Sequence, residues 1–100
     1  MTKRRIITHK LMWRDIFLTI REQADYIWPG QSHIEIHVVR PKRTILPITQ
    51  TGYRSHFIGS EELSLAGGAV AFVTAWLDRE AASRSWQRAE IKAQQLKLDL

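Results

Sequence analysis

The spacing of hydrophobic positions changes half-way along the chain, and this change predicts an α+β fold. In residues 5–58 apolar and polar residues tend to alternate, which is typical of strands with one buried face. In residues 60–97 apolar residues recur every three or four positions, as in amphipathic helices. Because the strands precede the helices, we expect three to four antiparallel strands, with two to three helices packed on one face of the sheet.

The clearest predicted strand covers residues 33–40. Its alternation places Ile34, Ile36 and Val38 on one face, and the opposite face then carries His33, Glu35, His37 and Val39. Pro41 is expected to end this strand, because proline has no backbone N–H to donate to a neighbouring strand.

Two earlier segments allow more than one interpretation. Residues 11–28 fit either a strand or a helix, and the β-branched and aromatic run at residues 16–20 favours the strand. Residues 28–30 read Trp-Pro-Gly and predict a turn on either interpretation. The basic residues 1–10 form either a flexible arm or a short edge strand, and we favour the arm, since chain ends are commonly frayed.

Residues 46–59 join the predicted sheet to the predicted helices. Gly52 suits a sharp turn because glycine tolerates positive φ. The residues that follow alternate between two faces of a strand. One face carries Tyr53, Ser55 and Phe57, and the other carries Arg54, His56 and Ile58.

The helical half begins near Ser60, which we expect to be the N-cap of a short helix that ends at Gly67-Gly68. The main helix is predicted over residues 69–82. A last helix, capped by Ser83 or Ser85, is predicted to extend to about residue 97. Its apolar seam packs either on the sheet or on a second copy of the chain, as a homodimer through the C-terminal helix, and consists of Trp86, Ala89, Ala93, Leu96 and Leu100.

Composition excludes several classes of function. The chain has 100 residues, which predicts one domain over residues 1–100, and 44% of them are hydrophobic. It has no cysteine, so disulfides, thiolate nucleophiles and cysteine metal ligands are excluded. No apolar run reaches the roughly 18 residues of a membrane helix and no signal peptide is evident, so we expect a cytoplasmic protein that does not enter a membrane. A nucleophile elbow and a P-loop are both absent, so we expect no enzyme and no cofactor.

The net charge of +5 is concentrated in the first half of the chain. Residues 1–59 carry ten Lys and Arg against four Asp and Glu, whereas residues 60–100 carry five against six. Such a basic region attracts nucleic acid or an acidic protein surface. Aromatic residues lie among these cations, a pattern that suits stacking on single-stranded nucleic acid. The candidate binding residues are Lys3, Arg4, Arg5, Lys42, Arg43, Arg54 and His56.

An alternative hypothesis is a metal-binding or small enzymatic site on the predicted strand at residues 33–40. His33, Glu35 and His37 share one face of that strand, and two histidines with a carboxylate form the ligand set of many iron and zinc sites. The spacing along a single strand is too wide for one ion, so His56 from a neighbouring strand would have to complete the set. The alternative without a metal is that these residues form the polar, solvent-facing side of an amphipathic strand.

Residues 33–57 resemble a strand–loop–strand unit of the C-terminal β-barrel of translation elongation factor Tu. There the second strand reads Gly-Tyr-Arg-Pro-Gln-Phe, and this chain keeps four of the six residues, reading Gly52, Tyr53, Arg54, Ser55, His56 and Phe57. The resemblance implies a barrel-like sheet fragment able to meet RNA or protein.

The block from Pro47 to Trp76 is similar to small uncharacterised proteins of proteobacterial plasmids and other mobile elements. The likeness runs through the segment Thr-Gly-Tyr-Arg-Ser-His-Phe at residues 51–57 and through Gly67-Gly68. It implies an accessory binding protein, for example one that inhibits a host defence system, and assigns no site. The leading hypothesis is therefore a non-enzymatic accessory binding protein with a basic N-terminal half.

Overall fold

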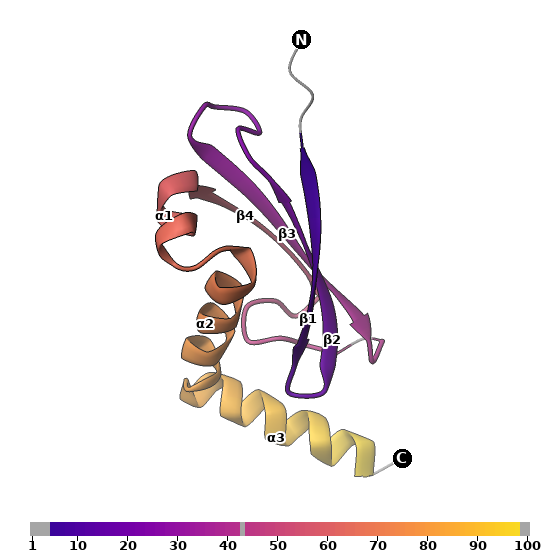
Figure 1. Cartoon of the computed structure of the whole chain (residues 1–100). Coiled ribbons are helices and arrows are strands. Elements are labelled where there is room, and N and C mark those ends of the chain that lie inside the picture. The colour runs from indigo at the N-terminus through magenta and orange to yellow at the C-terminus, as the bar shows by residue number, and fades with distance from the viewer. Residues whose placement is uncertain (1–4, 43, 99–100) are drawn as a thin grey trace.

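The computed structural model describes residues 5–42 and 44–98, which form an antiparallel sheet followed by helices (Figure 1). The predicted α+β class is confirmed. The strands are β1 (Ile6–Trp13), β2 (Ile16–Gln23), β3 (Gln31–Arg40) and β4 (Tyr53–Gly59), and the helices are α1 (Ser60–Leu65), α2 (Ala69–Ala81) and α3 (Arg84–Leu98).

The strands lie in the order β1-β2-β3-β4, and each pairs antiparallel with its neighbour. A two-residue turn joins β1 to β2, with φ of 47° at Arg14 and 65° at Asp15. Positive φ at both positions matches the twist of a tight hairpin. The strand interpretation of residues 16–20 is thus confirmed. The flexible-arm interpretation is wrong from Ile6 onward, because the ladder with β2 continues as far as the pair Ile6 and Gln23.

A β-bulge interrupts the end of β3. Leu18 of β2 pairs with Val38, but the preceding Phe17 pairs with Arg40, so Val39 is an extra residue. Simple alternation would place Val39 on the face of His37, and the bulge gives that place to Arg40 instead. The strand then ends before Pro41, as predicted.

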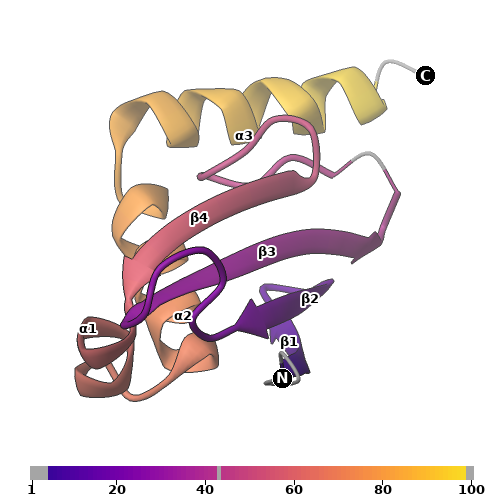
Figure 2. The same ribbon diagram turned by 90° about the horizontal axis from the view of Figure 1, so that it is seen from above.

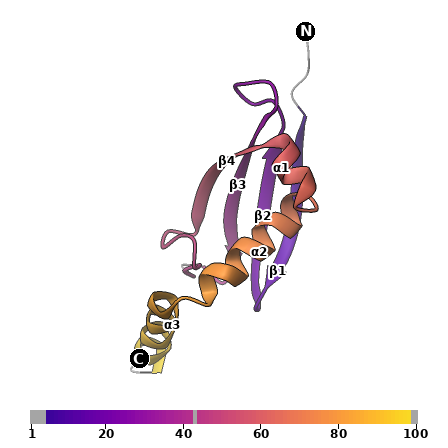
Figure 3. The same ribbon diagram turned by 90° about the vertical axis from the view of Figure 1, so that its left-hand side faces the viewer.

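The two faces of the sheet differ in what covers them. Helices α1 and α2 lie over one face, and the other face carries no helix of the described chain (Figure 3). The covered face holds the centre of the core, where Leu18, Ile20, Ile34 and Ile36 are completely buried. Burying such side chains contributes about 1.5–3 kcal/mol each. The predicted alternation in β2 and β3 therefore sets which face receives the helices.

Helices α1 and α2 are separated by Gly67 and Gly68, whose φ values of 98° and 101° favour glycine. The predicted break at this pair is confirmed. The predicted N-cap at Ser60 is wrong. Gly59 occupies the N-cap position without a side-chain hydrogen bond, and the Ser60 hydroxyl instead lies 2.7 Å from the Ser32 hydroxyl of β3. Helix α2 buries every fourth residue against the sheet, namely Ala69, Val73, Leu77 and Ala81.

Helix α3 begins as predicted after Ser83, whose Oγ accepts a hydrogen bond of 3.2 Å from the Trp86 backbone N–H. Only its first half contacts the core, through Trp86 and Ala89. Beyond that point it projects past the sheet (Figures 1 and 2), so the expectation that its seam packs on the sheet is wrong for Leu96, which is 59% exposed. Within the described ranges, no helix is long and apolar enough to span a membrane.

Candidate nucleic-acid interface

The helix-free side of the sheet is the candidate site, and we call it the open face. The strand registers assign its side chains, because residues paired across antiparallel strands point to the same side. The open face comprises Ile6, Thr8, Lys10 and Met12 of β1, Phe17, Thr19, Arg21 and Gln23 of β2, His33, Glu35, His37 and Arg40 of β3, and Tyr53, Ser55 and Phe57 of β4.

Three rings cluster at one end of the open face. His33 stacks on Tyr26 at a centroid distance of 4.8 Å and contacts the tilted ring of Phe57 at 4.7 Å, and the Tyr26 and Phe57 centroids are 6.1 Å apart. The His33 Nε2 atom is also 2.6 Å from the Ser55 hydroxyl, so the imidazole is held on three sides and is buried. Phe57 remains 43% exposed within this cluster. A flat apolar ring is therefore presented to solvent on a rigid support.

Glu35 occupies the middle of the open face and organises its neighbours. The Tyr53 hydroxyl donates a hydrogen bond of 3.0 Å to Glu35 Oε2. The Arg21 guanidinium and the His37 imidazole each lie 3.9 Å from the same carboxylate. The hydrogen bond to Glu35, followed by partial desolvation, raises the pKa of Tyr53 above its ordinary value. These contacts fix the Tyr53 ring, which is 42% exposed and lies 4.8 Å from the His37 ring.

Three cations share the open face with the exposed rings. The Arg40 guanidinium lies over Phe17, with its central carbon 5.3 Å from the ring centroid. Lys10 is exposed on β1, and Arg21 is about half exposed beside Glu35. Counting side chains that are fully charged at neutral pH, the open face has three cations and one carboxylate. It therefore combines a positive potential with exposed aromatic faces, which is the chemistry that single-stranded nucleic acid requires.

Comparison with known proteins gives one match. A family model described as the KlcB third domain matches residues 6–86, from the start of β1 to the first turn of α3. The chain belongs to the KlcB third-domain family. The matched range includes every strand and therefore the entire open face of this KlcB third-domain unit. No curated protein and no solved structure matches the chain.

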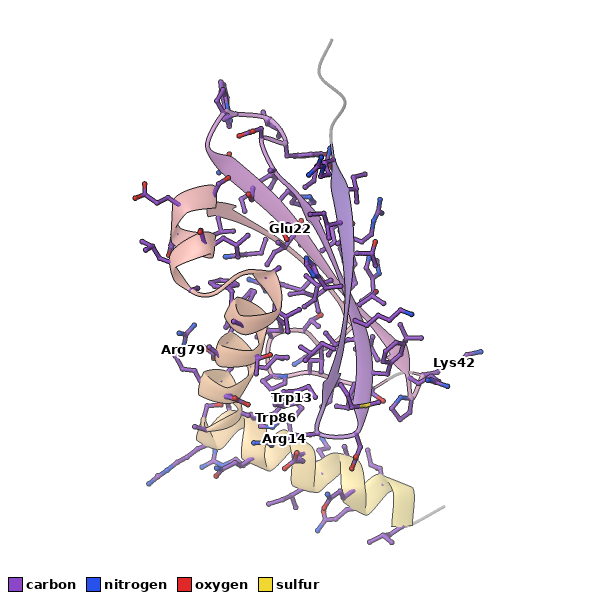
Figure 4. The ribbon with its side chains drawn as sticks, in the orientation of Figure 1. Trp13, Arg14, Glu22, Lys42, Arg79 and Trp86 are labelled. Atoms are coloured by element: carbon purple, nitrogen blue, oxygen red, sulfur yellow. The ribbon has the colours of Figure 1, made fainter. Side chains whose placement is uncertain are left out.

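The predicted binding residues lie in different places on this family's fold. Lys3, Arg4 and Arg43 lie outside the described residues. Arg5 is exposed directly before β1, and Lys42 is exposed in the turn after β3. Figure 4 shows Lys42 extending into solvent at the end of the sheet, away from α1 and α2. Lys42 therefore lies near the margin of the open face, beyond Arg40.

Arg54 and His56 share a face, as predicted, but it is the face covered by helices. Arg54 pairs with Ile36 and His56 pairs with Ile34, and both isoleucines point into the core. The Arg54 guanidinium lies over Trp76 at 5.4 Å and donates a hydrogen bond of 3.4 Å to the Ile48 carbonyl. His56 packs against Phe72 at 5.7 Å and Trp76 at 4.7 Å. Both residues connect β4 to the helix layer.

This position makes stability sensitive to the charge of His56. Burial against α2, and secondly the Arg54 charge, lower the pKa of His56 from its ordinary value near 6.5. The unfolded chain then binds a proton more readily than the folded one, so the contribution of neutral His56 is intact above about pH 6.5 and is lost as the pH falls towards the folded pKa.

We therefore expect His56→Gln to reduce the loss of thermal stability between about pH 7.5 and about pH 5, relative to the original protein. Thermal melts of both proteins across this range measure the difference. Equal slopes with pH would contradict this reading of His56.

The proposed metal ligands do not converge. His33, Glu35 and His37 share the open face as predicted, but His56 lies on the opposite face of the sheet. In residues 5–42 and 44–98, no group of three or more His, Asp or Glu side chains is arranged to hold a metal ion. The contacts of Glu35 go to Tyr53, Arg21 and His37 instead.

A groove of about 580 Å³ lies between the loop at residues 45–50 and the junction of α2 and α3, and Tyr53 is among the residues that line it. Arg54 and Trp86 both line it. The Trp86 indole Nε1 is buried and has no hydrogen-bond partner among the described residues. The described part of the core therefore contains a buried donor without a hydrogen bond, next to the groove.

Arg54 and His56 of β4 were the candidate binding residues predicted on this strand from the sequence, and Tyr53 and Phe57 were not among them. In the structure the two aromatic residues are exposed on the open face, whereas His56 packs against α2 and the exposed Arg54 lies over Trp76 on the helix-covered face. The alternation along the strand could have identified the two rings. It places Tyr53 and Phe57 on the same face of β4, and the polar residues of β3 lie opposite them. Nothing comparable in the sequence marked Arg21 or Arg40 as residues of the site.

Proposed function

We propose that this domain is a non-enzymatic accessory protein of a mobile element that binds single-stranded nucleic acid on the open face of its sheet. The observation that carries the proposal is the set of exposed rings on β4, Tyr53 and Phe57, held rigidly beside the cations of β1–β3. The mobile-element setting is supported by the similarity of residues 47–76 to plasmid proteins. A cytoplasmic location agrees with this role.

Both rings are held in place by their neighbours and are only partly covered. Phe57 contacts His33 and Tyr26, and Glu35 accepts the hydrogen bond from the Tyr53 hydroxyl. Phe57 is 43% exposed and Tyr53 is 42% exposed, so part of each ring is accessible to a base. Stacking on such rings contributes about 1–3 kcal/mol per base and depends little on sequence. Tyr53 and Phe57 are four residues apart on one strand, or about 13 Å, so a bound strand would engage both along β4.

The cations then supply the attraction to phosphate. Arg21 and Arg40 lie on β2 and β3, Lys10 lies on the far edge strand β1, and Lys42 extends the positive region beyond Arg40. Lysine and arginine contacts to phosphate release counterions, so the binding constant should fall steeply with salt. The open face also fits an acidic protein surface in charge, but such a partner has no need of the exposed rings, which is why we favour nucleic acid.

The test is the binding of a fluorescent oligo-dT and of a matched duplex over a series of salt concentrations. We expect the single strand to bind more tightly, with a logarithmic salt slope of about −0.7 for each phosphate contact. Removing two of the cations, by Lys10→Gln with Arg40→Gln, should reduce the slope by about 1.4.

The matched control removes two cations from the helices, by Arg79→Gln with Arg88→Gln. Arg79 points away from the sheet (Figure 4), and both residues are exposed. This variant has the same net charge as the open-face variant and should keep the slope of the original protein. Equal losses in the two variants would show attraction by net charge alone. No oligonucleotide binding at low salt would contradict the proposal and leave an acidic protein as the partner to seek.

A further inference from the structure

Strand β1 forms one edge of the sheet, and its outer side is unpaired. It pairs with β2 on one side only, and no other described segment lies along it (Figures 1 and 3). The other edge, β4, is partly capped, because the Thr49 and Thr51 hydroxyls donate to the Tyr53 carbonyl. An unpaired edge of eight residues is a template for another strand.

The hairpin turn fixes which backbone groups of β1 point outward. Trp13 and Ile16 flank the two-residue turn, so they form a hydrogen-bonded pair. Hydrogen-bonded and non-hydrogen-bonded pairs then alternate along an antiparallel ladder. Backbone groups of Leu11, His9 and Ile7 therefore face β2. The residues between them direct their N–H and C=O groups away from the sheet, and these are Ile6, Thr8, Lys10 and Met12.

We propose that this edge binds a second copy of the chain, with β1 pairing antiparallel to β1 of the partner subunit about a two-fold axis at His9. In this register Ile6 lies opposite Met12 of the partner subunit, and Thr8 lies opposite Lys10 of the partner subunit. The outward residues then form about eight backbone hydrogen bonds. This proposal is independent of what the open face binds.

Self-complementarity of the side chains supports this register. On the open face it joins Ile6 and Met12, which are 47% and 60% exposed in the single chain. On the helix-covered face it joins Ile7, which is 43% exposed, to Leu11. Each apolar residue thus meets an apolar partner. At the axis the His9 rings of the two subunits lie opposite each other. In each subunit the His9 Nε2 atom is 2.8 Å from Oε1 of Glu22 in the same chain.

Neighbouring registers are less favourable. A shift of the axis to Lys10 would place two ammonium groups directly opposite each other, which is destabilising. A shift to Thr8 would leave Met12 without a partner on the other strand. A shift of the axis to a point between two residues would pair outward backbone groups with inward ones, so their hydrogen bonds would not form. The register centred on His9 is therefore the one that satisfies both backbone and side chains.

The axis at His9 is perpendicular to the sheet. The product is a continuous sheet of eight strands, in which both helix layers lie on the same side and both open faces lie on the other. The dimer therefore doubles the open face instead of covering it.

The test is molar mass by sedimentation equilibrium, with thermal melts to verify folding. The original protein should form a dimer. Ile6→Glu with Met12→Glu places carboxylates opposite each other in two places and should give a monomer. Both side chains are substantially exposed in the single chain, so the fold should survive. Ile6→Lys with Met12→Glu places opposite charges in the same pairs and should restore the dimer.

Three outcomes would count against the proposal. One is a monomer for the original protein at every concentration. Another is a dimer that persists in the Glu–Glu variant and is lost in Leu96→Asp, which would assign the contact to the C-terminal helix. A Glu–Lys variant that remains monomeric while folded would reject the register centred on His9.

Discussion

Replacing both exposed rings of β4 by leucine, as Tyr53→Leu with Phe57→Leu, is expected to weaken oligo-dT binding by roughly 30-fold or more. Two stacking contacts at about 1–3 kcal/mol each account for this loss, since leucine retains apolar area but lacks a flat π face. Fluorescence anisotropy at constant salt measures the affinity. The salt slope should stay close to that of the original protein, because no cation is removed.

The matched control exchanges the two rings, as Tyr53→Phe with Phe57→Tyr. It keeps a ring at each position and removes the hydrogen bond to Glu35. We expect binding within a few-fold of the original. A large loss in this control would assign the effect to the Glu35 contacts and not to stacking. Unchanged binding in the leucine variant would contradict the proposed role of the open face.

The second large effect concerns the core. Trp86→Ala is expected to destabilise the fold by about 3–5 kcal/mol, because the indole is 8% exposed and connects α3 to the core. Trp86→Phe is expected to cost far less. It removes the Nε1 atom, which has no partner among the described residues, and so abolishes the penalty of a buried donor without a hydrogen bond.

Trp13→Phe provides the comparison. Both tryptophans lie near the junction of α2 and α3 (Figure 4), but the Trp13 Nε1 donates a hydrogen bond of 2.9 Å to the Asp78 carboxylate. The two substitutions remove the same atoms, so Trp13→Phe should be more destabilising by about 1–2 kcal/mol. Urea denaturation measures both. Equal costs would show that ring volume, and not the indole N–H, decides stability here.

Sequence alone predicted most of the elements and their order, but it did not predict β1, because residues 1–10 were interpreted as an arm. The β-branched run at residues 16–20 and the alternation at residues 33–40 predicted strands that the structure contains. The glycine pair at residues 67–68 and the serine at position 83 marked real helix boundaries. These are local signals, which depend on backbone preference and side-chain periodicity within one segment.

The candidate site needed information that no single segment holds. His56 falls on the face opposite His33 because β3 and β4 pair Ile34 with His56, and a register shifted by one residue would have placed the two histidines together. The register depends on the long connection between the strands. Helix α3 illustrates a second limit, since an apolar seam that includes Leu96 has the same spacing in the sequence whether it packs on the sheet or faces solvent.

The bulge at Val39 bears on how the family tolerates changes in chain length. A relative without this residue would pair the arginine with Phe17 in an unbroken ladder, whereas the present chain reaches the same pairing with one residue more. The bulge thus contains one extra residue without exchanging the faces of the neighbouring side chains. Insertions and deletions at this point are expected to be close to neutral in evolution, while those inside β3 or β4 would invert a whole face.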